Sequence, residues 1–144
     1  MYQKFNINIK MVRDKTLKYP KFNMPSKIFD AYKKLQENDV EEFHVLYLDT
    51  GNNLIGARMI SRGTLNSSLV HPREVFKLAI LKNAHSIICV HNHPSGRIEP
   101  SREDIDVTYR LIEAGKILGI GVLDHIIIGD NAYCSMQSDG IVEF

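Results

Sequence analysis

The chain lacks the features that mark secreted, membrane-spanning or nucleic-acid-binding proteins. Its two cysteines, Cys89 and Cys134, form neither a disulfide framework nor a Cys-x-x-Cys metal site, and free thiols suit a reducing cytoplasm. With 18 basic against 17 acidic residues, the formal charge of +1 gives no sequence-wide attraction to phosphate backbones. No apolar run is long enough to cross a membrane, and residues 1–4 lack the apolar core of a signal peptide. We therefore expect a cytoplasmic protein without affinity for membranes or nucleic acids.

The residues that are present suit one folded domain of mixed structure. A hydrophobic content of 44% in 144 residues is enough for a single core. Strands are expected at 6–12, 43–48, 54–61, 86–90, 122–128 and 131–135, with a hairpin turn at 49–53. Helices are expected at 26–37 after a Ser26 cap, at 72–81 and at about 101–115. This order predicts an α/β sandwich with a mixed sheet over residues 26–144, preceded by a strand and linker extension at 1–25.

The most informative stretch runs from His91 to Asp104, because it contains three possible metal ligands within fourteen residues. Residues 86–90 are short, β-branched and apolar, which indicates a buried strand. His91 and His93 follow at its end. Since strand residues two apart face the same way, both imidazoles can converge on one ion.

An acidic residue is expected to complete this set. The sequence Pro94-Ser95-Gly96 turns the chain, and Ser101 then opens the helix whose first turn contains Asp104. The helix dipole favours a carboxylate there. Two histidines and an aspartate would leave the fourth position of a tetrahedral ion to water, which is the arrangement of a catalytic zinc site.

Simpler interpretations exist for the same residues. Ser101-x-x-Asp104 resembles a capping box, so Asp104 could merely cap the helix. The paired histidines could be turn residues bonded to the backbone. Capping and metal binding by Asp104 are compatible with each other.

On this motif the chain resembles the RadC-like proteins of bacteria, which carry a JAMM (MPN-type) metalloprotease domain. The family pattern is a glutamate on an early strand, then His-x-His-Pro-Ser-Gly, then Ser-x-x-Asp with its serine eight residues after the second histidine. Here His91, His93, Ser101 and Asp104 stand in that register. Further similar segments are Glu41-x-Phe43, Leu48-Asp49, Gly63-Thr64, Pro72-Arg73-Glu74, Asn83-Ala84 and Leu123-Asp124-His125. Together they span residues 25–144.

The resemblance implies a fold, a cofactor and a reaction. The fold would be the JAMM/MPN, cytidine-deaminase-like sandwich, with one zinc ion held by His91, His93 and Asp104 and a water in the fourth place. Glu41 would be the general base and acid, and Ser101 would stabilise the oxyanion. The substrate would be a peptide or protein of unspecified identity, cleaved at a peptide or isopeptide bond.

Two adjacent acids compete for the catalytic position. Neighbouring strand residues face opposite sides, so only one of Glu41 and Glu42 can point at the metal. Glu41 shares a face with Phe43, and the Glu-x-Phe spacing of the family selects it. Without the resemblance, either acid would be taken as a solvated residue at the start of a strand.

The remaining polar residues have weaker claims to function. Asp106 lies two residues beyond Asp104, on a different side of the helix, so it is not expected to bind the metal. One of Asp124 and His125 could orient a ligand imidazole, and a buried role without metal is equally compatible. The following are expected to be structural, exposed or solvated: His44, His71, His85, Arg97, Glu99 and Arg102.

Three functional classes follow from these observations. A zinc hydrolase is favoured, and a metal-binding interaction module with little turnover is the alternative. A nucleic-acid enzyme is less expected: HNH nucleases spread their residues over a hairpin and helix, and the zinc deaminase signature His-x-Glu with Pro-Cys-x-x-Cys is absent. Longer RadC-like proteins also carry a helix-hairpin-helix region, which the first forty residues do not resemble. We therefore expect no DNA contact by that route.

Overall fold

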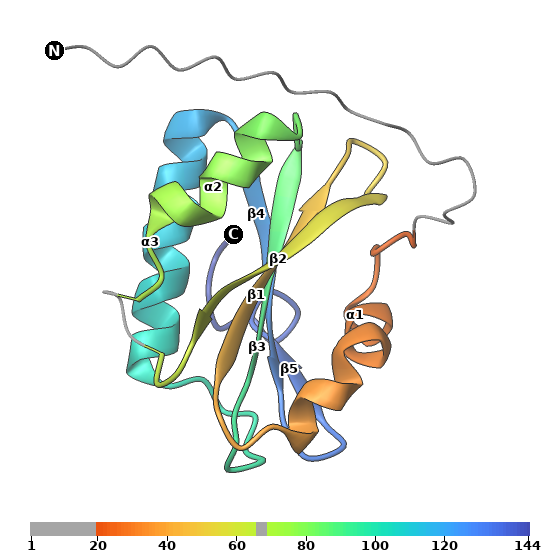
Figure 1. The fold of residues 1–144 in the computed structure, drawn as a ribbon, viewed down its shortest axis with the longest axis vertical. Coiled ribbons are helices and arrows are strands. Elements are labelled where there is room, and N and C mark those ends of the chain that lie inside the picture. Colours follow the sequence, from red (N-terminus) through yellow and green to blue (C-terminus); the bar gives the residue numbers. More distant parts are fainter. Residues whose placement is uncertain (1–19, 66–68) are drawn as a thin grey trace, which may run out of the picture.

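A computed structural model describes residues 20–65 and 69–144 (Figure 1). The strand expected at 6–12 lies outside these residues, and the boundary expected at residue 25 stays a prediction. The described strands form one sheet in the order β2-β1-β3-β4-β5. Their bounds are β1 Glu42–Leu48, β2 Leu54–Arg62, β3 Ser86–Asn92, β4 Gly121–Ile128 and β5 Tyr133–Ser135.

The sheet is mixed, as predicted. β1 pairs antiparallel with β2 through the expected hairpin and antiparallel with β3. β3 and β4 are parallel, and β4 and β5 are antiparallel. Parallel strands require a crossover connection, which the helix between β3 and β4 provides.

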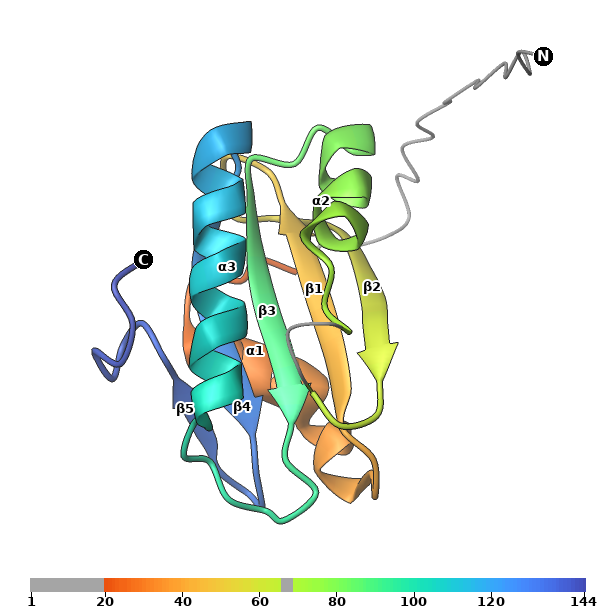
Figure 2. The same ribbon diagram turned by 90° about the vertical axis from the view of Figure 1, so that its left-hand side faces the viewer.

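Helices cover both faces of this sheet. Their bounds are α1 Pro25–Tyr32, followed by a 3-10 turn at Lys33–Glu37, α2 Pro72–Leu81 and α3 Arg102–Leu118. Figures 1 and 2 show α2 and α3 on one face and α1 on the other. Two apolar clusters fill the two interfaces. The α/β sandwich expected from the sequence is confirmed.

The central strand β3 supplies both clusters. All seven of its residues are buried, and they alternate between the faces. Ile87 and Cys89 pack towards α2 and α3, whereas Ile88 and Val90 pack towards α1. Because the alternation continues, the last two residues of the strand place polar side chains on opposite faces of the sheet.

Two helix boundaries differ from the prediction. Ser26 does not cap α1, because Pro25 already occupies the first helical turn and the N-cap is Met24, which makes no side-chain capping bond. The third helix continues past Gly115 and ends at Gly119, which has φ 72°. Gly115 has a packing reason instead: a Cβ there would collide with the carbonyl oxygen of Ile120.

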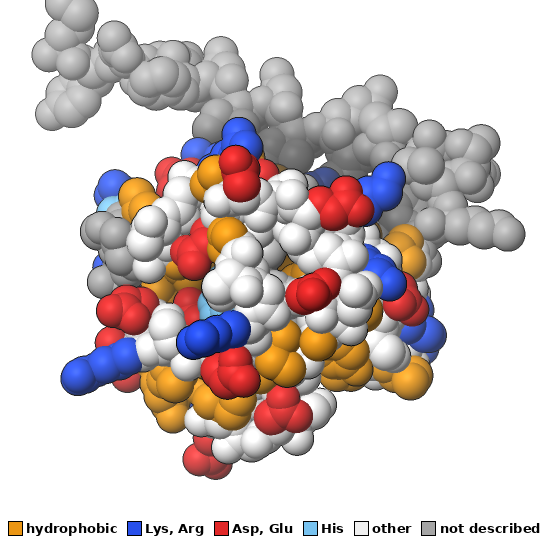
Figure 3. Space-filling model, turned by 90° about the horizontal axis from the view of Figure 1, so that it is seen from below, with side chains coloured by type: hydrophobic (Ala, Val, Ile, Leu, Met, Phe, Trp, Pro, Cys, Tyr) orange, Lys and Arg blue, Asp and Glu red, His pale blue; other side chains and the backbone are white. Residues whose placement is uncertain are grey.

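The end of the molecule at which β3 finishes has a mixed surface. Figure 3 shows acidic, basic and apolar side chains interspersed there, with only small areas of histidine visible. No helix among residues 20–65 and 69–144 has the length and apolar character needed to span a bilayer.

Candidate metal centre

The two histidines of the motif converge at the end of β3. His91 is within the strand and His93 follows it directly, so their side chains share a face. Their Nε2 atoms are 2.9 Å apart. The expected convergence of the imidazoles is confirmed.

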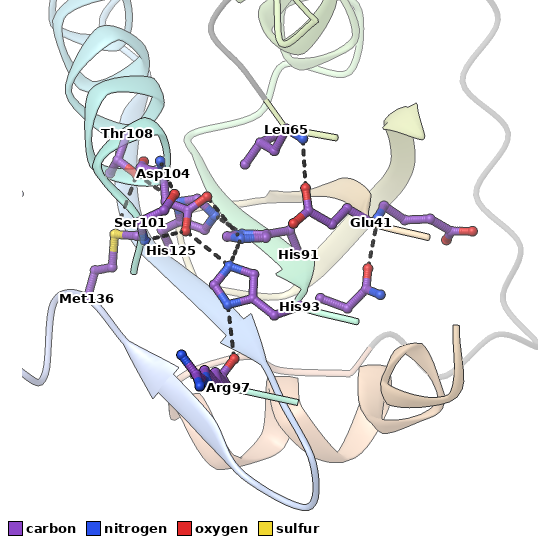
Figure 4. Close-up of polar contacts among 12 residues, drawn as sticks. Glu41, Leu65, His91, His93, Arg97, Ser101, Asp104, Thr108, His125 and Met136 are labelled. Atoms are coloured by element: carbon purple, nitrogen blue, oxygen red, sulfur yellow. Dashed lines mark hydrogen bonds and ion pairs between the residues drawn. The ribbon is translucent and has the colours of Figure 1, made fainter. Parts of the chain in front are cut away.

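Asp104 both caps α3 and faces these histidines. The Ser101 hydroxyl accepts a bond from the Asp104 N–H at 3.1 Å, and the Ser101 N–H donates to Oδ2 of Asp104 at 2.7 Å. The same carboxylate lies 3.2 Å from Nε2 of His91 through Oδ1 and 3.1 Å from Nε2 of His93 through Oδ2. The capping box and the meeting with the histidines therefore coexist, because the cap orients the carboxylate towards them (Figure 4).

These three residues fit a tetrahedral metal ion. With bonds of about 2.0 Å, the ligand atoms of a tetrahedral zinc site are about 3.3 Å apart. The two Nε2 atoms are 2.9 Å apart, and each has its own Asp104 oxygen near that value, Oδ1 at 3.2 Å from His91 and Oδ2 at 3.1 Å from His93. One ligand atom from each of the three residues lies within 4.8 Å of the others. Within residues 20–65 and 69–144, His91, His93 and Asp104 are the one group of this kind that could hold an ion. Side-chain exposures of 1%, 11% and 3% leave access mainly past His93.

The group behind His93 determines which nitrogen carries the proton. Nδ1 of His93 lies 2.9 Å from the carbonyl oxygen of Arg97, and a carbonyl can only accept. Nδ1 is therefore the protonated nitrogen, and Nε2 of the neutral ring presents its lone pair to the centre. This is the form of histidine that binds a metal.

His125 lies behind His91. Nε2 of His125 is 2.7 Å from Nδ1 of His91, and Nδ1 of His125 is 2.6 Å from the hydroxyl of Thr108. Of the two candidates in this segment, His125 and not Asp124 contacts a ligand imidazole. Asp124 instead accepts bonds from the Ser135 hydroxyl and from the N–H of Gln137, so it anchors the turn after β5.

The charges at the centre are strongly coupled. Burial by itself raises the pKa of Asp104, but the adjoining imidazoles of His91 and His93 outweigh it, and the net pKa is far below the ordinary value. Burial lowers the pKa of His93, but the hydrogen bond and charge of Asp104 outweigh it and raise the pKa overall. Burial, reinforced by His91, lowers the pKa of His125 well below its ordinary value, so His125 is neutral.

Glu41 directs its carboxylate towards the histidines. It immediately precedes β1, and its Oε2 accepts a bond from the N–H of Leu65 at 2.7 Å (Figure 4). Its charge also contributes to the raised pKa of His93. Glu42 is engaged elsewhere, with His44 at 2.9 Å and Arg62 at 3.5 Å. The two adjacent acids therefore have different partners, and the catalytic role of Glu41 stays a prediction.

Asn92 is a residue of the site that the sequence analysis missed. Its Oδ1 accepts a bond from the Glu42 N–H at 2.8 Å, and its Nδ2 donates to the carbonyl oxygen of Val40 at 3.0 Å. The buried amide therefore holds the backbone on both sides of Glu41. A polar residue at the end of a fully buried strand, next to His91, was the available signal.

The residues expected to stand outside the centre do so. Asp106 is exposed on α3, and the side chains of the loop charges Arg97, Glu99 and Arg102 are also exposed. Arg97 contributes to the centre through its carbonyl oxygen alone among the contacts described. Both cysteines are free thiols, as expected.

Comparison with known proteins relates this chain to a family. The RadC-like JAB domain family matches residues 22–141. A UPF0758 protein of Methanosarcina mazei is 51% identical over 124 residues, covering 85% of this chain and 54% of the relative. A UPF0758 protein of Desulforamulus reducens is 59% identical over 108 residues, covering 75% and 48%. Archaea as well as bacteria contain such relatives, so the resemblance is wider than the bacterial proteins first considered.

The extent of these matches defines what they establish. The chain spans about half the length of the relatives it matches, and their names state no activity. The family match covers nearly the whole chain, including every residue of the candidate centre. The chain therefore belongs to the RadC-like JAB domain family.

Proposed function

We propose that the protein is a zinc-dependent hydrolase of peptide or isopeptide bonds. The observation that supports this most directly is the convergence of His91, His93 and Asp104 at separations near those of a tetrahedral ion. Three ligand atoms leave the fourth position open. This open position is what distinguishes a catalytic zinc site from a structural one.

His91, His93 and Asp104 would hold the ion. Zinc bound there supplies a Lewis acid that activates water for attack on a carbonyl at neutral pH. The Asp104 carboxylate balances part of the charge of the ion, and the cap on α3 keeps it in place.

Glu41 is assigned the proton transfers. Its carboxylate accepts a proton from the attacking water and returns it to the leaving amine, the two roles of one general base and acid. The Leu65 N–H holds one carboxylate oxygen, and Asn92 holds the flanking backbone. A base kept in position in this way needs little reorganisation during the reaction.

Ser101 is assigned to the oxygen of the scissile carbonyl. Its Oγ already accepts a bond from the Asp104 N–H, so the hydroxyl proton remains to be donated. A donor placed where negative charge develops typically contributes about a hundredfold or more in rate. The hydroxyl is fixed to the same helix turn as a metal ligand, which sets its position relative to the ion.

The experiment that tests this function compares two adjacent glutamates. Zinc-loaded wild-type protein, Glu41→Gln and the matched control Glu42→Gln are incubated with peptide and isopeptide libraries, and zinc is measured per chain. We expect Glu41→Gln to retain one zinc and to lose hydrolysis by about 100-fold or more, because an acid–base catalyst contributes 10²–10⁴-fold. Glu42→Gln should retain both. Equal hydrolysis by wild type and Glu41→Gln would reject the role of Glu41.

The same variant can identify the substrate. A protein that binds but does not cleave should retain its peptide or protein partner from a cell extract, and that partner can then be tested for cleavage by the wild type. Stoichiometric zinc without turnover of the trapped partner would indicate the interaction module instead. Both buried thiols are free, which is consistent with our proposal that the protein acts in the cytoplasm.

A further inference from the structure

A line of buried hydrogen bonds leads from α3 to the back of His91. The Thr108 hydroxyl lies 2.6 Å from Nδ1 of His125, and Nε2 of His125 lies 2.7 Å from Nδ1 of His91. All three side chains are buried, and Figure 4 labels them at the start of α3 and the end of the sheet. Since each link contains one proton, the donor at one end determines the direction of every bond along the line.

The direction follows from counting protons at Thr108. Its hydroxyl has one proton and three neighbours: the carbonyl oxygen of Asp104 at 2.7 Å, Nδ1 of His125 at 2.6 Å and the sulfur of Met136 at 3.5 Å. A carbonyl oxygen can only accept, and it is a far better acceptor than a thioether. If the proton pointed elsewhere, two oxygens would face each other at 2.7 Å without one. The Thr108 proton therefore goes to Asp104.

The remaining bonds are then determined. Nδ1 of His125 donates to the Thr108 oxygen, so Nε2 of the neutral His125 ring must accept. Nδ1 of His91 donates to that nitrogen, and Nε2 of His91 is left with a bare lone pair. That lone pair is directed at His93 and Asp104, where the ion would bind.

The reverse direction would disable the centre. If Thr108 donated to His125, His125 would donate to His91, and Nε2 of His91 would carry a proton. A protonated nitrogen cannot be a metal ligand. This alternative does not arise for His93, because a backbone carbonyl determines its tautomer.

We propose that Thr108 is a positioning residue of the metal centre, whose hydroxyl sets the tautomer of His125 and, through it, presents the unprotonated Nε2 of His91 to the ion. The inference rests on the proposed metal site but not on hydrolysis. Asp104 takes part twice, since its carboxylate faces the ion and its carbonyl receives the Thr108 proton. Helix α3 therefore positions one ligand directly and selects the protonation of another.

The test compares Thr108→Val with Thr108→Ser. Valine keeps the shape of threonine without the hydroxyl, whereas serine keeps the hydroxyl. The zinc dissociation constant is measured by competition with a chromogenic chelator, using zinc alone as the probe. Because the loss of a group supporting a ligand typically weakens metal binding 10–100-fold, we expect that effect for Thr108→Val and a value within about threefold of wild type for Thr108→Ser.

A second measurement reads the tautomers directly. Ring nitrogen-15 NMR of the metal-free wild-type protein should show His91 and His125 both protonated at Nδ1. In Thr108→Val this preference should weaken. A wild-type His91 protonated at Nε2 would overturn the proposal, even if the valine variant failed to fold.

The outcomes separate this inference from the proposed function. An unchanged zinc dissociation constant in a folded Thr108→Val protein would overturn the role of Thr108 and leave the hydrolase proposal intact. A wild-type protein that binds no zinc would overturn both. Absence of hydrolysis has no bearing on either measurement.

Discussion

His91 and Asn92 are neighbours at the end of β3, yet they serve the two faces of the sheet in different ways. Both are buried. His91 faces α3, where its Nε2, Nε2 of His93 and the two carboxylate oxygens of Asp104 converge at 2.9 to 3.2 Å. Asn92 faces the other way, and its amide satisfies one backbone donor and one backbone acceptor. One face is therefore incomplete without a cation or proton, whereas the other is complete in itself.

The physical reason for the difference is the charge of the groups that meet. Lone pairs at 2.9 to 3.2 Å repel each other unless a positive charge lies among them, so the α3 face gains stability from whatever it binds. A neutral amide paired with backbone groups gains nothing from an ion. The effect of a substitution on stability should therefore depend on bound metal on the α3 face, and it should not on the face of Asn92.

The largest effect is expected from Asp104→Ala. It removes a proposed ligand, its counter-charge and the bond from the Ser101 N–H to the carboxylate, so we expect loss of stoichiometric zinc and a further loss of about 1 kcal/mol from the broken half of the capping box. Elemental analysis and thermal unfolding measure the two effects. Asp106→Ala, an exposed change two residues along the same helix, is the control. Full zinc occupancy in Asp104→Ala would dismiss Asp104 as a ligand.

A smaller and metal-independent effect is expected from Asn92→Ala. It leaves the Glu42 N–H and the Val40 carbonyl without their partner, and because both groups are only part-buried we expect a cost near the lower end of the about 1–3 kcal/mol of a buried unsatisfied group. Chemical denaturation should show the same loss with zinc and with a chelator, while the zinc dissociation constant stays within a few-fold of wild type. Hydrolysis should fall, because the backbone around Glu41 is released.

The Asn92→Ala variant can show that the two faces of the sheet are not independent, and it needs a control. Asn23→Ala, an exposed asparagine, should change stability by less than about 0.5 kcal/mol and serves as the control. If Asn92→Ala weakened zinc binding as strongly as a ligand substitution, the two faces would not be energetically separate.

The smallest effect is a pH dependence. The stability of the metal-free protein and its affinity for zinc should change in opposite directions as pH rises. Without metal, the raised pKa of His93 means that its pairing with Asp104 stabilises the fold below the ordinary histidine pKa and that this contribution is lost as pH rises through the raised value. The lowered pKa of Asp104 adds stability that is fully present above the ordinary carboxyl pKa and is lost progressively as pH falls below it. Zinc competes with the proton on His93, so zinc affinity should rise over the window in which metal-free stability falls.

Thermal unfolding at several pH values, with chelator and with zinc, measures these opposite trends. His93→Gln should flatten the metal-free profile in the neutral window, because it removes the titrating group. A metal-free protein that became more stable as pH rose through that window would contradict the assigned charge state of His93.

Local patterns were sufficient to predict much of the site. The two-residue spacing of the histidines and the three-residue spacing of Ser101 and Asp104 each lie within one strand end or one helix turn, where geometry is regular. Helix α2 has the predicted bounds for the same reason, since Pro72 marks its start. Ser26 was wrongly predicted to cap α1, because Pro25 already begins the helix. Gly115 was wrongly predicted to end α3, because this glycine serves a close approach to the Ile120 carbonyl instead.

The sequence by itself determined the shared face of His91 and His93 and the capping box of α3, because each depends on residues two or three positions apart. Only the tertiary structure decided which groups support them. His125 lies 34 residues from His91, Asn92 lies 50 from Glu42, and Thr108 lies 17 from His125. Contacts at such separations depend on strand register and on the seating of α3, which no local period encodes.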